Sequence, residues 1–333
     1  MPDLRIGVIG LGYIGRLHAR AWAANSGARV VAVADPNPAS RESAPDGARW
    51  FGDHRALLAE NLDAVSICSP THLHREMTID ALDSGKHVLL EKPIAVNMEE
   101  AGEIVAAAQR AGKLLFVGMT HRFYPELREA KRLLDEGAIG RLIMCRDSIL
   151  EHLGMLTAPS WYLDKAQAGG GVVLSSGIHL VDRLRWFTGE EITEVAGAAS
   201  NHYFGKPVED AAQMFLRFRS GITAEIVFSF ASHPRPLVCD LELVGSCGQL
   251  TVHTWRGYEL DNQNGRFEKT FYTGEPHWQK VLIGLTAEVE EFCAAIRERR
   301  APWPSADEST KALAAVAAFY RAVESGQFER VYS

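Results

Sequence analysis

The sequence predicts an α/β protein of two domains: a doubly wound domain around a mostly parallel sheet, then an α+β domain around a large, mainly antiparallel, open-faced sheet. Three observations support this prediction. The chain has 333 residues, more than a single hydrophobic core usually serves. Its first third alternates short β-branched runs with helical patterns, and beyond residue 140 the apolar residues alternate along longer runs. We therefore place the first domain at 1–121 and the second at 122–333.

The first domain consists of repeated strand–helix units. In chain order, strands are expected in RIGVIG, ARVVAVAD, DAVSICSP, HVLL and LLFVGM, with helices from about residue 14, near residues 55 and 73, and after residue 97. The runs VVAVA and AVSIC are apolar at successive positions, as in parallel strands covered by helices on both faces. Asn97 followed by Glu100 predicts a capped helix start and Gly112 a helix end, so a helix is expected over 98–111.

The second domain has the pattern of antiparallel strands with one covered face. The stretches AAQMFLRFRSGITAEIVFSF and LVCDLELVGSCGQLTVHTW each alternate apolar and polar residues on both sides of a turn signal, SG or GSCG. A final helix over about 306–325 has apolar residues at helical spacing and is expected to pack back on the body of the protein.

Composition excludes several classes of function. The formal charge is -7 and the basic residues form no cluster, which argues against nucleic acid and anionic membranes as partners. No apolar run approaches the roughly 20 residues that span a bilayer, and the start MPDLRIGVIG lacks a secretory signal. The five cysteines are scattered, without a CxxC pair, so neither a disulfide framework nor a metal site is indicated. We expect a cytoplasmic protein with a small-molecule ligand.

The segment GLGYIG at 10–15 matches the dinucleotide-binding fingerprint G-x-G-x-x-G in its proper context, after a strand and at the start of a helix. Gly10 permits the tight turn, Gly12 lets the backbone approach a pyrophosphate, and Gly15 lets helix and strand pack closely. The free N–H groups of the helix start, at Tyr13 and Ile14, would hold the anion.

An acidic residue, Asp35, ends the next strand twenty positions after Gly15, as the fingerprint requires. Its carboxylate would accept hydrogen bonds from the adenosine ribose and repel a 2′-phosphate, which favours NAD over NADP. Arg41 is a cation that could still reach this site. The alternative is an ordinary strand-to-helix turn with Asp35 as a loop cap.

The chain resembles the Gfo/Idh/MocA family, which includes glucose-fructose oxidoreductase and inositol 2-dehydrogenase. The resemblance covers nearly the whole length, and the stretches that carry it are GLGYIG, SPTHLH at 69–74, GKHVLLEKP at 85–93, AGKLLFVGMTHRF at 111–123, Trp161 before GGG at 169–171, and GIHLVD at 177–182. It implies a Rossmann domain for the nicotinamide cofactor, followed by a domain that binds substrate and forms a homodimer or homotetramer.

The resemblance assigns the chemistry to the strand end EKP. It implies that Lys92 faces both the nicotinamide ribose and the substrate, that Glu91 lines the cofactor side, and that Pro93 follows a cis peptide bond. Moving a hydride from a carbinol carbon leaves a hydroxyl proton to be removed, and a desolvated lysine can titrate near neutral pH for that purpose. The alternative is a charged strand end that returns to solvent.

The stretch GGGVVLSSGIHLVDRLRW predicts a glycine turn leading into one helix, with a polar face formed by Ser175, His179, Asp182 or Arg183, and Trp186. The resemblance implies that His179 is a substrate-contacting acid/base. Family members usually carry Asp four residues before this histidine, where the chain has Ser175. Either Asp182 orients His179 instead, or Ser175 binds a substrate hydroxyl; the alternative is a structural helix in which Asp182 satisfies His179.

Further candidates follow from the resemblance. It places Ser69, Pro70 and His72 along the cofactor, with His74 a weaker candidate, and Arg122 and Trp161 along the substrate. The loops 150–168 and 232–237 are expected to determine substrate choice.

The sequence therefore predicts hydride transfer between NAD and a secondary alcohol or ketone of a sugar, polyol, inositol or related cyclic compound. Lys92 and His179 would handle the proton. Two other hypotheses remain. Ser175 favours a non-catalytic NAD-binding sensor, and a tightly held NAD would favour an enzyme that oxidises transiently while cleaving a glycoside.

Overall fold

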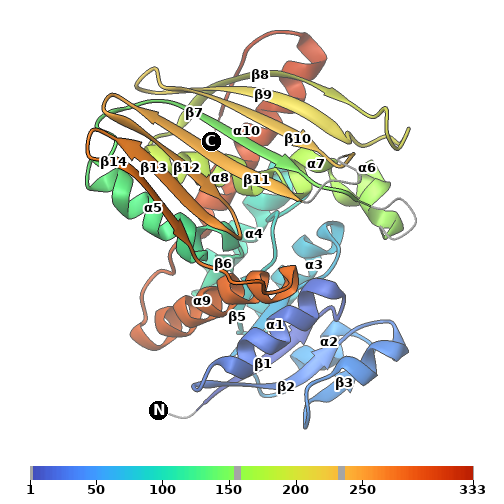
Figure 1. Cartoon of the computed structure of the whole chain (residues 1–333). Helices are drawn as coiled ribbons and strands as arrows, with labels where there is room; N and C mark the ends of the chain where they lie inside the picture. Colours follow the sequence, from blue (N-terminus) through green and yellow to red (C-terminus); the bar gives the residue numbers. More distant parts are fainter. Residues whose placement is uncertain (1–2, 154–158, 232–236, 333) are drawn as a thin grey trace. The chain divides into compact units, whose positions relative to one another are not determined.

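A computed structural model describes residues 3–153, 159–231 and 237–332. The chain divides into two compact units, each assembled from two separate segments (Figure 1). The first comprises Met1–Thr120 with Trp278–Thr310, and the second comprises His121–His277 with Lys311–Ser333.

The first unit contains a parallel sheet of strand order β3-β2-β1-β4-β5-β6, as the alternation of strands and helices predicts. The strands are β1 Leu4–Ile9, β2 Ala28–Ala34, β3 Arg49–Phe51, β4 Ala64–Ile67, β5 His87–Leu90 and β6 Leu115–Val117. The helices are α1 Tyr13–Ala24, α2 His54–Leu58, α3 His74–Asp83 and α4 Met98–Ala111, with 3-10 segments η1 Pro38–Ser43, η2 Thr71–Leu73 and η3 Thr120–Phe123. The short edge strand β3 was not expected, because its run RWF is too brief to show a period.

Helix α4 has the limits that its sequence predicts. The Asn97 side chain accepts the backbone N–H of Glu100 at 2.9 Å, and Gly112 takes the left-handed conformation with φ 61°. These two residues set the start and the end of α4, the helix that follows β5.

Helix α9, His277–Glu298, returns the chain to the first unit. Its Phe292 is fully buried, stacks on Phe116 at 5.8 Å between ring centroids, and meets the ring of Trp22 edge-on at 6.3 Å. This apolar contact explains why residues 278–310 group with the first unit. The first unit therefore differs from the predicted first domain, which comprised residues 1–121 and left all later residues to the second domain.

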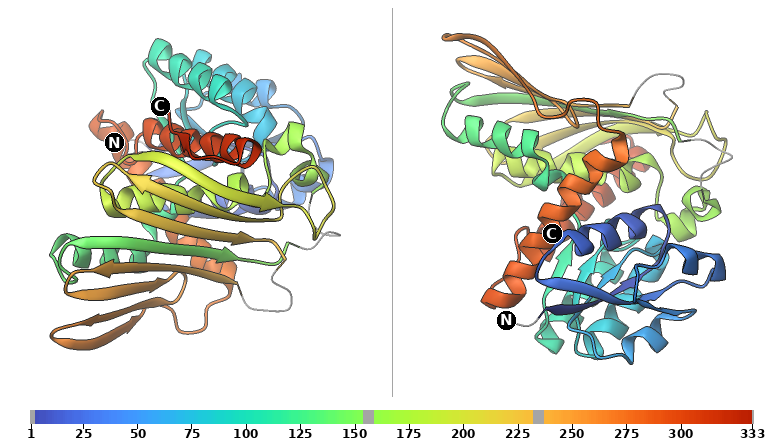
Figure 2. Two further views of the ribbon diagram at one scale, coloured as in Figure 1. Left: turned by 90° about the horizontal axis from the view of Figure 1, so that it is seen from above. Right: turned by 60° about the horizontal axis from the view of Figure 1, so that its bottom comes forward.

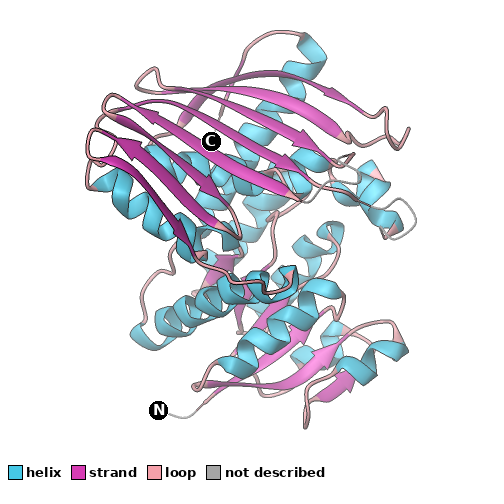
Figure 3. Ribbon diagram, in the orientation of Figure 1, coloured by secondary structure: helices cyan, strands magenta, loops and turns pink. Residues whose placement is uncertain are grey.

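The second unit contains a nine-stranded sheet of order β14-β13-β12-β11-β7-β10-β9-β8-β15. Figure 3 draws its strands in magenta. Neighbouring strands are antiparallel except β7 and β10, which are parallel. The strands are β7 Leu142–Leu150, β8 Ile192–Ser200, β9 Ala211–Phe218, β10 Thr223–Ser229, β11 Val238–Gly245, β12 Gly248–His253, β13 Gly257–Asn262, β14 Gly265–Thr270 and β15 Glu329–Arg330.

Helices cover one face of this sheet (Figure 2). They are α5 Pro125–Asp135, α7 Val172–Ser175, α8 Ile178–Thr188 and α10 Ala306–Ser325. The unit also contains α6 Lys165–Ala168 and the 3-10 segment η4 Ser160–Leu163, which contact each other. Along β11, Cys239, Leu241 and Leu243 are buried, whereas Asp240 and Glu242 between them are half-buried. This alternation is the pattern of a sheet with one covered face.

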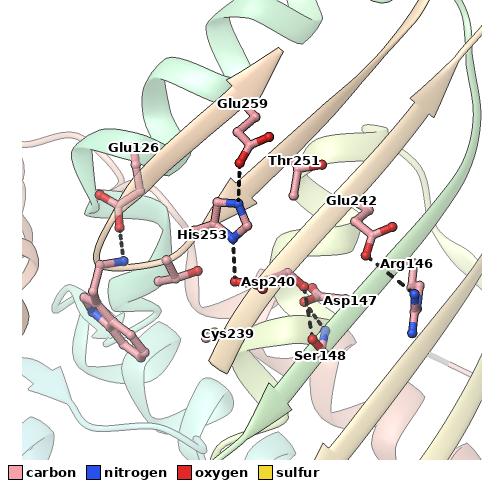
Figure 4. Close-up of polar contacts among 12 residues, drawn as sticks. Glu126, Arg146, Asp147, Ser148, Cys239, Asp240, Glu242, Thr251, His253 and Glu259 are labelled. Atoms are coloured by element: carbon pink, nitrogen blue, oxygen red, sulfur yellow. Dashed lines mark hydrogen bonds and ion pairs between the residues drawn. The ribbon is translucent and has the colours of Figure 1, made fainter. Parts of the chain in front are cut away.

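The other face of the sheet carries ion pairs between neighbouring strands (Figure 4). His253 lies directly opposite Asp240, with 3.0 Å between its Nδ1 and the Oδ1 of Asp240, and 3.6 Å separates its Nε2 from the Oε1 of Glu259. Arg146 and Glu242 form a second pair at 3.6 Å. This part of the uncovered face is therefore polar. Among the helices in the described ranges, none combines the length and apolar character needed to span a membrane.

Candidate active site

The glycines of the fingerprint form the turn between β1 and α1. Gly10 has φ 88°, and a Cβ on it would lie 2.7 Å from the carbonyl oxygen of Cys68. A Cβ on Gly15 would lie 1.9 Å from the carbonyl oxygen of Gly10, so the helix can approach the turn only without a side chain there. Around Gly12, by contrast, no described atom lies within 4 Å of the Cβ position. This open space at the N-terminus of α1, beside Tyr13, fits a pyrophosphate.

The carboxylate of Asp35 is fixed by main-chain hydrogen bonds. Its Oδ2 accepts the N–H of Leu11 at 2.7 Å, and its Oδ1 accepts the N–H of Asn37 at 2.8 Å. Each oxygen keeps a further lone pair. The side chain therefore stands beside the glycine turn with acceptor capacity left, which fits ribose hydroxyls.

The segment EKP follows β5 and is held by a buried ion pair. Glu91 is buried, its Oε1 lies 2.9 Å from the Nε2 of His18, and its Oε2 accepts the N–H of Lys92 at 3.0 Å. Burial alone would raise the pKa of Glu91, but the hydrogen bond and charge of His18 outweigh burial and lower this pKa. Lys92–Pro93 is a cis peptide bond, as the resemblance implies. Glu91 is therefore an anchored carboxylate, next to Lys92 in the chain.

The SPTHLH segment meets EKP through His74. The Nδ1 of His74 lies 2.8 Å from the carbonyl oxygen of Pro93, and its Nε2 lies 3.0 Å from that of Ser69. Burial lowers the pKa of His74, and the neutral ring donates one of these two bonds. Within the described residues, the buried Oγ of Ser69 and Nδ1 of His72 have no hydrogen-bond partner. These orphaned atoms fit a ligand that supplies polar partners.

A second buried carboxyl lies in the same unit, on α9. Glu288 is fully buried, its Oε2 accepts the hydroxyl of Thr120 at 2.9 Å, and its Oε1 has no partner within the described residues. A Cβ on Gly118, which follows β6, would lie 3.2 Å from this Oε1. Burial, and next the charge of Glu91, raise the pKa of Glu288 well above its ordinary value. The first unit therefore holds one buried carboxyl with a lowered pKa and one with a raised pKa.

In the second unit, Arg122 and Asp182 form a buried bidentate pair. The Nε and Nη2 of Arg122 donate to the two carboxylate oxygens of Asp182 at 2.8 and 2.7 Å. Arg122 also lies over the ring of Trp186, 5.9 Å from its centroid. The predicted site residues Arg122 and Asp182 are thus brought together, and both oxygens of Asp182 are used by Arg122.

The polar helix is interrupted before His179. Ser175 ends α7, and His179 lies in the first turn of α8. The expectation of one continuous helix with a shared polar face is therefore wrong. The chain breaks at Gly177, whose N–H donates to the carbonyl of Val172 and whose missing Cβ would lie 2.4 Å from the Phe228 ring.

His179 packs against another histidine of the same unit. The rings of His179 and His121 are stacked, with centroids 4.3 Å apart and planes 3° from parallel. Beside them lies Arg183, fully buried, which pairs with Asp147 through two nitrogens, one of them Nε at 2.7 Å. Burial would lower the pKa of Arg183, but Asp147 outweighs burial and raises it, so Arg183 remains a cation.

The remaining candidates are Trp161, which lies in η4, and the two loops predicted to determine substrate choice. Trp161 is half-buried and packs on the ring of Tyr162 at 4.3 Å. The loops predicted to determine substrate choice fall partly at 154–158 and 232–236, which lie outside the described residues.

Sequence reasoning missed several polar residues of the two units. His18, Glu288, His121 and Asp147 carried no recognisable signal: His18 lies in a predicted helix, and Glu288 and Asp147 lie in stretches for which no element was predicted. Only His121 lay inside a stretch singled out for another reason, AGKLLFVGMTHRF. Spacing along the chain does not reveal such residues, since their partners are 36 to 168 positions away.

One group of side chains within the described ranges has the spacing of metal ligands, namely His54, Glu76 and Asp80. The guanidinium of Arg55 contacts Glu76 at 2.5 Å and Asp80 at 3.0 Å. Because this cation already neutralises both carboxylates, we assign no metal to the group.

Comparisons with known proteins match two stretches of the chain to family models. Residues 4–119 match the family model described as "Oxidoreductase family, NAD-binding Rossmann fold", and residues 127–251 match the Gfo/Idh/MocA C-terminal domain.

Relatives cover most of the chain. An inositol 2-dehydrogenase of Saccharopolyspora erythraea is 33% identical over 75% of this chain and 73% of its own length. The levoglucosan dehydrogenase of Pseudarthrobacter phenanthrenivorans is 27% identical over 92% of both chains. The crystal structure of the WlbA dehydrogenase from Bordetella pertussis, in complex with NADH and UDP-GlcNAcA, superimposes with a TM-score of 0.87 at 25% identity, covering 100% of this chain and 99% of that one.

Proposed function

Because this chain belongs to the Gfo/Idh/MocA family of oxidoreductases, we propose that it transfers a hydride between NAD and a sugar, polyol, inositol or related cyclic compound. The reacting group is a secondary alcohol in one direction and a ketone in the other. The relatives named above are dehydrogenases of compounds of this class by their names. The chain is accordingly an enzyme of the dehydrogenase class with an NAD-binding Rossmann domain.

A single observation carries the proposal. Four polar segments follow the carboxyl ends of four strands that are neighbours in one parallel sheet: the glycine turn after β1, Asp35 after β2, Ser69 and Pro70 after β4, and Glu91–Lys92 after β5. In an open parallel sheet these ends meet at one edge, and ligands bind there. The chain thus supplies an anion site, a ribose acceptor and a lysine along one line of strands.

Lys92 is proposed as the residue that exchanges the proton of the substrate hydroxyl. NAD, when bound, supplies the hydride acceptor. Glu91 fixes the backbone at Lys92 by accepting its N–H, and His18 holds Glu91 in place. An amine so placed can hydrogen-bond the substrate oxygen and take its proton.

His179 is proposed as the second proton carrier. Ser175 carries no charge and Asp182 is engaged with Arg122, so we propose that neither acts as a carboxylate partner of His179. Ser175, Arg122 and Trp161 are proposed to contact the substrate. The loops 150–168 and 232–237, whose residues 154–158 and 232–236 lie outside the described ranges, are proposed to determine which substrate is chosen.

NAD is proposed as the preferred cofactor. The Asp35 carboxylate, fixed by two N–H groups, would repel a 2′-phosphate. Arg41, in η1, is the nearest sequence candidate for an opposing cation. We also propose a homodimer or homotetramer, and the expectation of a cytoplasmic location remains a prediction.

The test follows reduced nicotinamide by its absorbance. The purified protein, with NAD or separately NADP, meets a panel of inositols, aldoses, anhydrosugars and polyols. We expect turnover with at least one cyclic compound and a preference for NAD. Lys92→Ala should lower kcat/KM by about 10²- to 10⁴-fold, the usual worth of a general acid–base group, while cofactor binding, measured by fluorescence quenching, stays within about threefold.

The matched control is Lys86→Ala, a lysine just before β5, which should leave both measurements unchanged. Absence of turnover across the panel with intact NAD binding would contradict the proposal and favour the sensor. NAD that survives purification and oxidises only glycosides would favour the glycoside-cleaving enzyme instead.

A further inference from the structure

The imidazole of His179 stacks on a second imidazole. The rings of His179 and His121 lie 4.3 Å apart and only 3° from parallel, and both residues are more than nine-tenths buried. Stacked rings in this arrangement do not hydrogen-bond to each other. The contact therefore fixes the plane of the His179 ring without consuming either of its nitrogens.

The charge state of His121 follows from its other neighbour. The Nη1 of Arg183 lies 3.5 Å from the Nδ1 of His121 and within the geometry of a hydrogen bond. A guanidinium has donors only, so the Nδ1 of His121 must be the acceptor and carry no hydrogen. This contact favours a neutral His121 ring with its hydrogen on Nε2.

Arg183 is itself held in place. Its Nη1 donates to the hydroxyl of Thr254 at 2.8 Å, and Asp147 takes its Nε and Nη2. A cation fixed in this way opposes protonation of His121 by like charge. Asp147 thus holds Arg183 where its positive charge disfavours the protonated form of His121.

Aromatic rings hold the sides of His121. Trp255 meets it edge-on, at 5.7 Å and 89°, and Tyr124 lies at 5.5 Å. The backbone of Trp255, at φ 64°, is held by its N–H, which donates to the Oε1 of buried Glu126 at 2.6 Å. The His121 ring is therefore supported from its sides as well as from Arg183.

We propose that His121 is a positioning residue: a fixed, neutral ring that sets the plane of the His179 imidazole and leaves His179 as the only member of the pair that takes up a proton. The inference rests on the proposed role of His179 and adds how that role is made possible without the usual aspartate. Two imidazolium rings at this distance would repel each other. One ring must therefore stay neutral if the other is to take up and release a proton.

Several ionisable groups of the second unit lie close to the pair or to Arg183, and burial raises the pKa of one of them, Asp147, to about 6. Those close to it or to Arg183 come from four elements or their ends and are Tyr124, Glu126, Asp147, Arg183 and Cys239. Asp147 faces Arg183 rather than the rings, and burial raises the pKa of Glu126. Of these groups, Arg183 is the cation that contacts the His121 ring.

The first test measures protonation without substrate. Long-range ¹H–¹⁵N correlation spectra of the histidine-labelled protein, between pH 5 and 8, report the tautomer of each ring, and His121→Phe and His179→Asn assign the two signals. We expect His121 to keep an unprotonated Nδ1 over the whole range while His179 moves in one transition. A titrating His121 would overturn the inference.

The second test compares side chains at position 121 in the turnover assay. His121→Phe keeps a flat ring and should retain kcat within about fivefold, whereas His121→Leu removes the ring and should lower kcat by about 10- to 100-fold with KM changed less than threefold. His253→Leu, on the uncovered face of the sheet (Figure 4), is the matched control and should change neither constant. Equal losses in the phenylalanine and leucine variants would contradict a positioning role.

The two tests separate this inference from the proposed function. If no substrate is turned over, the spectra still decide whether His121 is the neutral member. If turnover depends on Lys92 but His121 titrates freely, the proposed function stands and this inference fails.

Discussion

Two buried glutamates of the first unit show how environment decides the charge of one residue type. Glu91 has a histidine against one oxygen and a backbone N–H against the other, whereas Glu288 receives a single hydroxyl. Burial disfavours both anions, and only Glu91 has partners that outweigh it. The unit therefore carries one negative charge next to Lys92 in the chain instead of two in its interior.

Replacing Glu288 by glutamine should make stability less dependent on pH. The unfolded chain ionises this carboxyl near pH 4.3, whereas the folded state retains the proton to higher pH. The folded state therefore loses stability as pH rises from about 4.3 toward the raised pKa. Glu288→Gln should melt at a higher temperature than the wild type at pH 8, by roughly 3–6 °C, and at nearly the same temperature at pH 5.

Calorimetric or fluorescence melting at pH 5, 6.5 and 8 measures this difference. The control is Glu290→Gln, an exposed carboxyl on the same helix, which should show the same difference from wild type at every pH. A pH-independent difference for Glu288→Gln would mean that the carboxyl is ionised in the folded protein.

At the scale of elements, the connection from β1 to α1 depends on the absence of two side chains. Of the three fingerprint glycines, Gly10 and Gly15 are required by the turn itself, and Gly12 faces open space. The turn is therefore built to leave backbone N–H groups accessible. Packing alone thus accounts for Gly10 and Gly15, whereas the open space at Gly12 fits a ligand.

Gly15→Ala should disrupt this element. Its Cβ would lie 1.9 Å from the carbonyl oxygen of Gly10, so the helix must move away from the turn. We expect a loss of about 1–3 kcal/mol in stability and at least tenfold weaker NAD binding in a calorimetric titration. Gly102→Ala, in α4 with nothing within 4 Å of the new Cβ, is the control and should stabilise by about 0.5–1 kcal/mol. Unchanged NAD affinity in Gly15→Ala would contradict this account.

The elements with a regular period were predictable from the sequence. Five of the six parallel strands, the limits of α4 and the hairpins β9–β10 and β11–β12 follow from apolar runs, a cap and turn residues. The break at Gly177 was not predictable, because it depends on contact with Phe228 some 50 positions later. Likewise the fingerprint, Lys92 and His179 could be read along the chain, whereas His18, His121 and Glu288 became visible only once strands and helices had brought them to their partners.

At the scale of the whole molecule, the first unit is discontinuous. Its core contains Trp22 and Phe116 from the first segment and Phe292 from α9. These rings belong to a single apolar cluster although 176 positions separate Phe116 from Phe292. The unit can therefore be complete only when both segments are present.

A polypeptide of residues 1–120 should accordingly fail to fold cooperatively. Without α9 it exposes the rings of Trp22 and Phe116, and we expect it to bind a hydrophobic dye and to lack a sharp melting transition. Residues 1–120 joined by a flexible linker to residues 278–310 should melt cooperatively and bind NAD. A cooperative transition in the shorter polypeptide would show that α9 is dispensable.

The chain passes from one unit to the other after residues 120, 277 and 310. Recombination between genes of this family is constrained as a result. A single crossover near residue 120 would join the first segment of one parent to the α9 of another, so that Phe292 of one lineage would have to fit Trp22 and Phe116 of a different one. Exchange of a whole cofactor-binding unit requires two segments to be inherited together, and we expect Phe292 to covary with the rings it packs against.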